Sequence, residues 1–221
     1  MTSPQLEIRI VPVTPLQQNT SLVWNKETKD GLFIDPGGEV DRLMGAAKQF
    51  GVTISKILLT HGHIDHAGGA AEIRDRTGCV IEGPHEADQW LLDSMEQQGP
   101  TYGMPDARNV VPDRHLNHGE VIDICGLEFG VSHCPGHSPG HVIFHNQPGK
   151  LAFVGDVLFQ GSIGRTDLPG GNHQELLDAI VQHLWPLGDD MRFIPGHGPP
   201  STFGQERKTN AFVADAVLAA S

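Results

Sequence analysis

Three histidines and one aspartate fall within seven consecutive residues, in the order THGHIDH from Thr60 to His66. This composition favours neither a helix nor the core of a strand, because imidazole and carboxylate groups gain little from apolar packing. Both groups are good ligands for Zn²⁺, Mn²⁺ and iron. We therefore interpret His61, His63, Asp65 and His66 as candidate metal ligands.

Three later segments offer ligands of the same kind, namely CPGH ending at His137, GD ending at Asp156 and PGHG around His197. Each follows a short apolar run that is typical of a β-strand, and each contains glycine, which permits sharp turns and close approach. Loops at strand ends can converge on one point while the sheets hold them still. We therefore add His137, Asp156 and His197 to the candidate ligands.

The seven candidates comprise five imidazoles, two carboxylates and no thiolate. Such a set favours Zn²⁺, Mn²⁺ or iron over a cysteine-rich structural zinc site. Seven ligands exceed what one tetrahedral ion uses, and a shared carboxylate can hold two ions ~3.5–4 Å apart. The other eight histidines are interpreted as ordinary residues, with His133 and His141 as candidates for supporting contacts only.

The bulk properties limit the classes of function. The chain has 221 residues, of which 38% are hydrophobic, which suits one globular domain over 1–221. A formal charge of −12 disfavours a nucleic-acid partner and would be offset in part by bound cations. Three cysteines without a C-x-x-C pair fit a reducing compartment. The apolar runs are too short for a membrane span, and the N-terminus lacks the pattern of a signal peptide, so we expect a cytoplasmic protein.

Apolar spacing predicts the elements that position these residues. Strands are expected at 6–13, 21–24, 32–34, 57–60, 80–81, 121–124, 128–133, 142–145, 151–154 and 193–194. Helices are expected at 40–50, 67–77, 174–184 and 210–220, the third with a capping box of Asn172 and Glu175. The mixture predicts an α/β protein with two sheets covered outside by helices.

Residues 84–118 do not fit this alternation. The segment has helical turns at 86–95 and then several glycines and prolines, and it is too long for a simple connection. We interpret it as a candidate insertion or lid over the site, with Tyr102 or Met104 near the substrate.

The sequence resembles the metallo-β-lactamase fold superfamily, whose signature matches THGHIDH. The similarity extends over nearly the whole chain, from QNT at 18–20 and IDPGG at 34–38 to PGHGP at 195–199. Within it, CPGHSPGH, GDVLF and GRTDLPGG resemble the glyoxalase II-like hydrolases, above all the short bacterial type. The resemblance implies a four-layer αββα sandwich. It also implies hydrolysis of thioesters such as S-lactoylglutathione by a metal-bound hydroxide.

The same resemblance implies a role for each ligand. One metal would be held by His61, His63 and His137, and the second by Asp65, His66 and His197. Asp156 would bridge them, and Asp65 would also act as the catalytic residue that orients the hydroxide and accepts its proton. The implied cofactors are two divalent ions, with Zn²⁺ as the first choice and iron or Mn²⁺ as alternatives.

Substrate binding is implied at Arg165, because GRTD matches the position where glyoxalase II has a basic residue for the glutathione carboxylate. The alternative is that Arg165 pairs with Asp167 and only braces the loop. Full-length glyoxalase II has a C-terminal helical domain that helps to bind glutathione, whereas only 24 residues follow His197. Arg207 and Lys208 are candidate replacements, the alternative being a solvated surface pair.

Other functions remain open at this point. A mononuclear-iron persulfide dioxygenase of the same superfamily shares the GRTD stretch, although the complete second ligand set favours a binuclear hydrolase. A lactonase or a phosphodiesterase is another alternative, because metals alone do not select the electrophile. A metal-binding regulatory protein without turnover is the non-enzymatic alternative, and the nearby basic residue argues against it.

Overall fold

The N-terminal half forms a five-stranded sheet in the computed structural model, which describes residues 5–219. Strands β1 (Leu6–Val13), β2 (Gln18–Asn25) and β3 (Asp30–Ile34) pair antiparallel. Strands β4 (Thr53–Leu58) and β5 (Val80–Glu82) add in parallel. The parallel pairs need crossovers, which α1 (Val40–Phe50) and α3 (Ala70–Thr77) supply.

The C-terminal half forms a six-stranded sheet in the order β13-β12-β9-β8-β7-β6. Its strands are β6 (Val121–Ile124), β7 (Leu127–His133), β8 (Val142–Asn146), β9 (Leu151–Gly155), β12 (Arg192–Pro195) and β13 (Ser201–Thr202). A small hairpin pairs β10 (Leu158–Phe159) with β11 (Ser162–Ile163). The helical elements are α6 (His173–Ala179), the π-helical η2 (Ile180–Leu184), the 3-10 turn η3 (Trp185–Leu187), α7 (Phe203–Thr209) and α8 (Asp215–Leu218).

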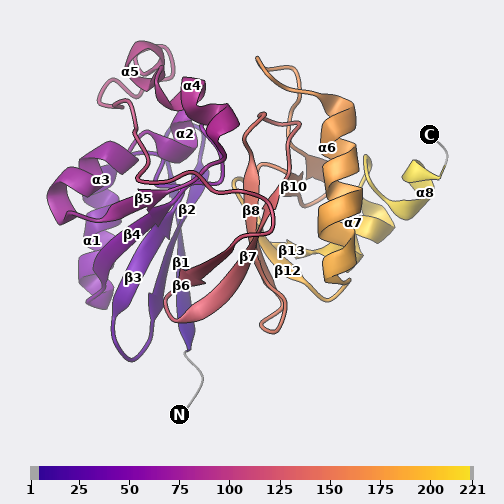
Figure 1. The fold of residues 1–221 in the computed structure, drawn as a ribbon, viewed down its shortest axis with the longest axis horizontal. Helices are drawn as coiled ribbons and strands as arrows, with labels where there is room; N and C mark the ends of the chain where they lie inside the picture. Colours follow the sequence, from indigo (N-terminus) through magenta and orange to yellow (C-terminus); the bar gives the residue numbers. More distant parts are fainter. Residues whose placement is uncertain (1–4, 220–221) are drawn as a thin grey trace.

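The elements form four layers, with helices outside each of the two sheets (Figure 1), and three apolar clusters lie between these layers. The first packs α1 and α3 on the N-terminal sheet and contains Leu43, Ile73 and Phe33. The second lies between the two sheets and contains residues of both, such as Leu32 and Phe144. The third packs α6, η2 and α7 on the C-terminal sheet. This arrangement is the expected αββα sandwich.

Several predicted elements match the structure, including 6–13, 40–50 and 121–124 and the Asn172 cap, whose side chain accepts from the N–H groups of Gln174 and Glu175. The helix predicted at 67–77 is two helices, α2 (Ile64–Ala67) and α3. The strand predicted at 57–60 ends earlier, at Leu58. Beyond residue 179 the helix predicted at 174–184 becomes π-helical.

The helix predicted at 210–220 is shorter in the structure, because only 215–218 of this range is helical. The chain forms α7 before this position and α8 within it, and residues 220–221 lie outside the described part. Asn210 explains the break, because its backbone is extended and its side chain donates to the carbonyls of Phe159 and Ser162. The side chain of Thr202 caps α7 by accepting from the N–H of Gln205.

Residues 84–118 form the turn η1 (Glu86–Asp88) and the short helices α4 (Gln89–Leu92) and α5 (Met95–Gln98). Leu92, Met95 and Val110 belong to the same core cluster as the N-terminal sheet. The segment is therefore packed into the domain over part of its length.

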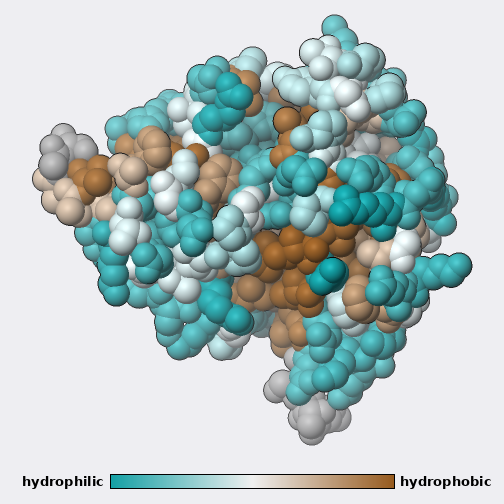
Figure 2. All heavy atoms as spheres, turned by 180° about the vertical axis from the view of Figure 1, so that it is seen from behind, coloured by the Kyte–Doolittle hydropathy of each residue, from teal (hydrophilic) through white to brown (hydrophobic). Residues whose placement is uncertain are grey.

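Seen from behind, the surface is largely hydrophilic around one central apolar area (Figure 2). Strand β1 is an edge strand, and its Ile8 and Ile10 are only half-buried. Among the described residues, no helix is long and apolar enough to cross a membrane.

Candidate metal centre

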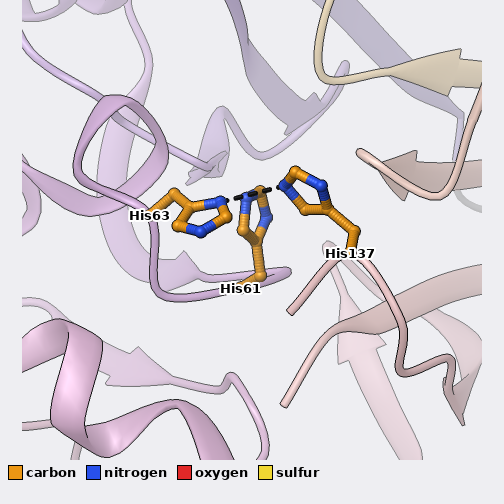
Figure 3. Close-up of side chains that lie close together, drawn as sticks. All are labelled: His61, His63 and His137. Carbon is orange, nitrogen blue, oxygen red and sulfur yellow. Dashed lines mark hydrogen bonds between the residues drawn. The ribbon is translucent and has the colours of Figure 1, made fainter. Parts of the chain in front are cut away.

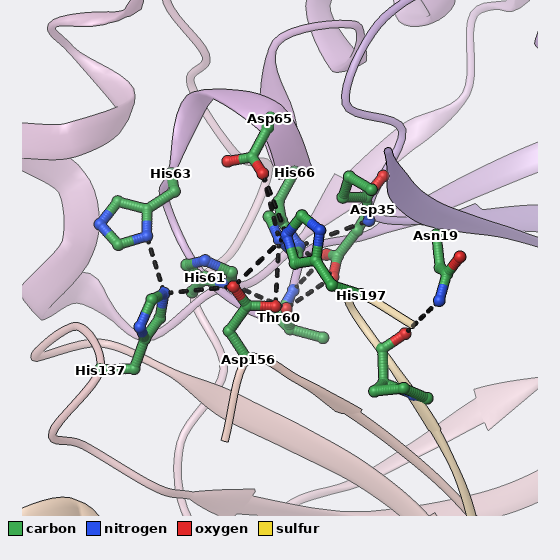
Figure 4. Close-up of polar contacts among 12 residues, drawn as sticks. Asn19, Asp35, Thr60, His61, His63, Asp65, His66, His137, Asp156 and His197 are labelled. Atoms are coloured by element: carbon green, nitrogen blue, oxygen red, sulfur yellow. Dashed lines mark hydrogen bonds and ion pairs between the residues drawn. The ribbon is translucent and has the colours of Figure 1, made fainter. Parts of the chain in front are cut away.

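The candidate ligands meet where four strands end. Strand β4 leads into the loop of His61 and His63 and then α2, and β7 leads into the loop of His137. Strands β9 and β12 deliver Asp156 and His197. Since these strands come from both sheets, the side chains converge at one end of the sandwich (Figure 4).

The first group of ligand atoms belongs to three histidines. His61, His63 and His137 each offer a nitrogen, and these atoms lie within 4.8 Å of one another. His63 Nδ1 and His137 Nε2 are 2.9 Å apart, and the three rings face a common point (Figure 3). This is the ligand type and number of a three-histidine metal site.

The second group consists of Asp65, His66 and His197, whose ligand atoms also lie within 4.8 Å of one another. His197 Nε2 is 3.2 Å from Asp65 Oδ2. Asp65 and His66 are on α2, so the short helix turns both side chains toward the loop after β12.

Asp156 lies between the two groups. Its Oδ1 is 3.3 Å from His66 Nε2, and its Oδ2 is 3.5 Å from His137 Nε2 and 3.6 Å from His197 Nε2 (Figure 4). One carboxylate therefore reaches ligands of both groups, which is the position that a bridging ligand requires.

Asp35 orients His61 and His66 through hydrogen bonds on their Nδ1 side, opposite Nε2. Its Oδ2 is 2.9 Å from His66 Nδ1 and accepts from the Thr60 hydroxyl at 2.6 Å, while its Oδ1 accepts from the Thr60 N–H at 2.7 Å. The Thr60 oxygen is in turn 3.1 Å from His61 Nδ1. Because the carboxylate only accepts, Nδ1 of His66 carries a proton and Nε2 is left for a metal.

Two further imidazoles, those of His137 and His197, are held by backbone carbonyls. His137 Nδ1 is 2.8 Å from the Arg165 oxygen, and His197 Nδ1 is 3.2 Å from the Leu16 oxygen. Asn19 fixes the loop of His197, since its amide donates to the carbonyls of Pro195 and Gly198. The two carbonyl contacts set the orientation of each ring so that Nε2 points toward the ligand groups, where His137 Nε2 lies 2.9 Å from His63 Nδ1 and His197 Nε2 lies 3.2 Å from Asp65 Oδ2.

The residues present fit a bound metal ion. Nε2 of His61, Nε2 of His66 and Oδ1 of Asp156 are buried and have no hydrogen-bond partner among residues 5–219. Oδ1 of Asp156 and Nε2 of His66 are near enough for an ion pair but lack hydrogen-bond geometry. Buried polar atoms without partners are costly, and cations bound at the two ligand groups would satisfy them.

The pKa values agree with this reading. Burial and then the other imidazoles hold the pKa of His61 well below its usual value, and burial followed by His137 lowers the pKa of His63 to about 3. Both rings are therefore neutral and can donate a lone pair to a metal. Burial opposes charge on His66, but Asp156 and Asp65 outweigh it and raise its pKa. The carboxylates of Asp156 and Asp65 therefore favour a positive charge at this position, as a bound metal ion would supply.

Backbone geometry and His141 support the bridging position. A Cβ on Gly196 would lie 2.1 Å from Asp156 Oδ1, so only glycine allows this approach. His141 is buried, stacks on His61 at 4.6 Å and accepts from the Asp156 N–H at 2.9 Å. His133 contacts the Pro139 oxygen instead, at 2.8 Å.

Among the described residues, the side chains of the candidate substrate residues make no hydrogen bond or ion pair with the ligand side chains, and their surroundings differ. Arg165 is exposed and makes two 2.8 Å hydrogen bonds to Asp167, which lower the pKa of Asp167 to about 2. Tyr102 is 43% exposed. Met104 is 9% exposed and lies in a small apolar cluster with Ile64 and Ala107.

Arg207 is engaged elsewhere. Its guanidinium binds Asp189 and Asp215 and lies over the Trp185 ring, on the outer face of the C-terminal half. Lys208 is exposed on α7. The contacts of Arg207 favour the surface interpretation of this pair.

Sequence reasoning assigned no role to Asp35, Thr60, Asn19 or Asp88. Asp35 and Asn19 lie within the motifs that carry the family resemblance, and that was their only signal. Asp88, which is buried, has no comparable signal in the sequence.

The fold and the two ligand groups define a class of protein. The model of the metallo-β-lactamase superfamily matches residues 13–197, and the chain belongs to that superfamily. It is 44% identical over 209 residues to the hydroxyacylglutathione hydrolase GloC of Haemophilus influenzae, covering 94% of this chain and 98% of that protein. It is also 35% identical over 207 residues to YqgX of Bacillus subtilis, a probable metallo-hydrolase, covering 93% and 96% of the two chains. The chain is thus similar to a short glyoxalase II-like protein and is a metallo-hydrolase of this superfamily.

Solved structures show the same similarity. The B3 metallo-β-lactamase BLEG-1 superposes with a TM-score of 0.86 at 35% identity, covering 94% of this chain and 99% of that chain. TTHA1623, solved in a di-iron-bound form, gives 0.82 at 36% identity, covering 92% and 99%. ETHE1 from Myxococcus xanthus gives 0.76 at 24% identity, covering 94% and 84%, and shows the fold alone.

Proposed function

We propose that this protein is a binuclear metal-dependent thioester hydrolase that acts on S-acyl glutathiones such as S-lactoylglutathione. The observation that carries the proposal is the position of Asp156 between two complete ligand groups. The similarity to GloC over almost the full length of both chains supports the substrate class.

Divalent ions held by the seven ligands would supply a Lewis acid and lower the pKa of water toward neutrality. Zn²⁺ suits the imidazole-rich set, and iron or Mn²⁺ suits it as well. Asp65 is the residue that accepts the proton of the attacking water, because its side chain faces the space between the groups. His66 and the His197 hydrogen bond outweigh burial and lower the pKa of Asp65, so it is ionised and can accept.

A thioester suits this site because its leaving group needs little help. A thiol has a pKa of about 8.5, so it departs as thiolate without a dedicated general acid. The groups that surround Asp156 are imidazoles and carboxylates already used as ligands or supports. An amide would need protonation of its nitrogen from a further residue.

Arg165 is proposed to meet a carboxylate of the glutathione moiety, with Tyr102 beside it. A guanidinium binds a carboxylate through two parallel hydrogen bonds, as Arg165 already binds Asp167. The substrate must therefore compete with Asp167 for this arginine. The free cysteines fit a reducing compartment, and we propose a cytoplasmic location without nucleic-acid or membrane partners.

The proposal is tested by a substrate panel on protein of known metal content. S-Lactoylglutathione should be hydrolysed with the highest kcat/KM, and activity should be lost with a chelator and restored by Zn²⁺, Mn²⁺ or Fe²⁺. The panel also contains a β-lactam, a lactone, a phosphodiester and glutathione persulfide with oxygen uptake recorded. A higher kcat/KM for any of these substrates would replace the thioesterase assignment. Absence of turnover by fully metal-loaded protein would contradict it.

A further inference from the structure

One buried carboxylate outside the ligand set joins the two loops that carry the first histidine group. Asp88 ends the turn η1 and has 0% of its surface exposed. Its Oδ2 accepts from the Gly62 N–H at 2.8 Å and from the Ser138 hydroxyl at 2.7 Å. Its Oδ1 accepts from the Gly140 N–H at 2.5 Å.

Two of these three donors are next to ligands in the sequence, and Gly140 lies three residues after His137. Gly62 lies between His61 and His63, and Ser138 follows His137. The Asp88 carboxylate therefore fixes the distance between the loop after β4 and the loop after β7. All three histidines of the first group come from these two loops.

The two loops pack closely against Asp88, so a shift of Asp88 would displace Gly62 and Gly140. A Cβ added to Gly140 would lie 2.6–2.7 Å from backbone and side-chain atoms of Asp88. A Cβ added to Gly62 would lie 2.9 Å from the backbone oxygen of Asp88. The adjoining His85 N–H donates to the Gly140 oxygen at 3.1 Å, so the turn η1 meets the second loop twice.

The second group has different supports. His66 is oriented by Asp35, and His197 by the Leu16 carbonyl. We infer that Asp88 is a positioning residue for the metal held by His61, His63 and His137, and that it has little influence on the metal held by Asp65, His66 and His197. This inference rests on the two ligand groups of the proposed function.

An amide at this position cannot replace the carboxylate. Asn offers one acceptor oxygen, and its NH₂ group would face either the Gly140 N–H or the donors Gly62 and Ser138. Asp88→Asn should therefore shift the loops apart and weaken zinc binding by roughly 10- to 100-fold, as for other residues that support metal ligands. Ser138→Ala removes one donor and keeps the carboxylate, so its effect should be smaller.

The test measures zinc affinity by competition with a chromophoric chelator, without substrate. His197→Ala leaves the first group intact, and His63→Ala leaves the second intact. Asp88→Asn should weaken zinc binding in the His197→Ala background and not in the His63→Ala background. Asp93→Asn, an exposed carboxylate on the same segment, is the matched control and should change neither.

Equal weakening in both backgrounds, or none in either, would overturn the inference for Asp88. If Asp88→Asn fails to fold, Ser138→Ala must show the same selectivity for the first group, and its absence counts against the inference. If the His197→Ala parent binds no zinc, the first group is not a metal site and the inference falls with it. A negative substrate panel leaves all of these results unaffected, because no turnover is measured.

Discussion

The Asp35 carboxylate lies 2.9 Å from His66 Nδ1 and reaches His61 through the Thr60 hydroxyl. One buried group thus sets the ring orientation of a histidine in each ligand group. Asp35→Asn should lower the affinity for the first and the second metal together, by about 10- to 100-fold. Chelator competition measures both, with the exposed Asp106→Asn as control; unchanged affinity would show that Asp35 has no such role.

Arg165→Ala should lower kcat/KM for S-lactoylglutathione by roughly 10- to 150-fold, because charged hydrogen bonds contribute about 1.5–3 kcal/mol. A small neutral thioester should be affected little. The bond from His137 to Arg165 uses the backbone oxygen, so the variant keeps this support.

The partner variant separates binding from bracing of the loop. If Arg165 binds substrate, Asp167→Ala frees the guanidinium and should lower KM for the charged thioester. If the pair only braces the loop, both variants should lose activity on charged and neutral thioesters alike, with a lower Tm. That second pattern would rule out a carboxylate-binding role for Arg165.

Tyr102 and Met104 should behave differently although they are two residues apart. Tyr102→Ala should raise KM for the glutathione thioester if this residue binds substrate, with little change in Tm, since the side chain is exposed. Met104→Ala should lower the free energy of unfolding by about 2 kcal/mol or more, because it empties a buried site against Ile64. Kinetics and thermal unfolding of both variants check this, and an unchanged KM for Tyr102→Ala would remove it from the substrate site.

His183 should make folding sensitive to acid. Burial, followed by His118 and His133, lowers the pKa of His183 below 6.5. The unfolded chain therefore takes up this proton first as pH falls, and stability decreases below about pH 6.5. His183→Gln should flatten the fall in Tm between about pH 7.5 and about pH 5.5. His173→Gln, exposed on the adjoining helix α6, should retain the wild-type slope; equal slopes for wild type and His183→Gln would contradict the prediction.

The layered fold could be predicted from the sequence because the spacing of apolar residues and the positions of turn residues are local signals. The strand 6–13 and the helix 40–50 could be placed to the residue for that reason. The helix expected at 210–220 begins only at Asp215, because Asn210 is extended and binds carbonyls of β10 and β11, a contact between distant parts of the chain. Local pattern carries no information about such a contact.

The same distinction applies to the site. The candidate ligands were visible because they occur in a dense motif and at strand ends. Asp35 and Asp88 act through hydrogen bonds to residues 25 to 52 positions away, and Arg165 is paired with Asp167 in the structure. Their roles follow from geometry that spacing alone does not define.

The central claim is that two ions, shared through Asp156, support thioester hydrolysis. Apoprotein is titrated with Zn²⁺, and kcat/KM for S-lactoylglutathione is measured at each step together with bound metal. We predict that activity rises until about two ions are bound per chain and that Asp156→Ala no longer reaches this level. Full activity with one bound ion, or a single iron per chain with oxygen uptake on glutathione persulfide, would contradict the account.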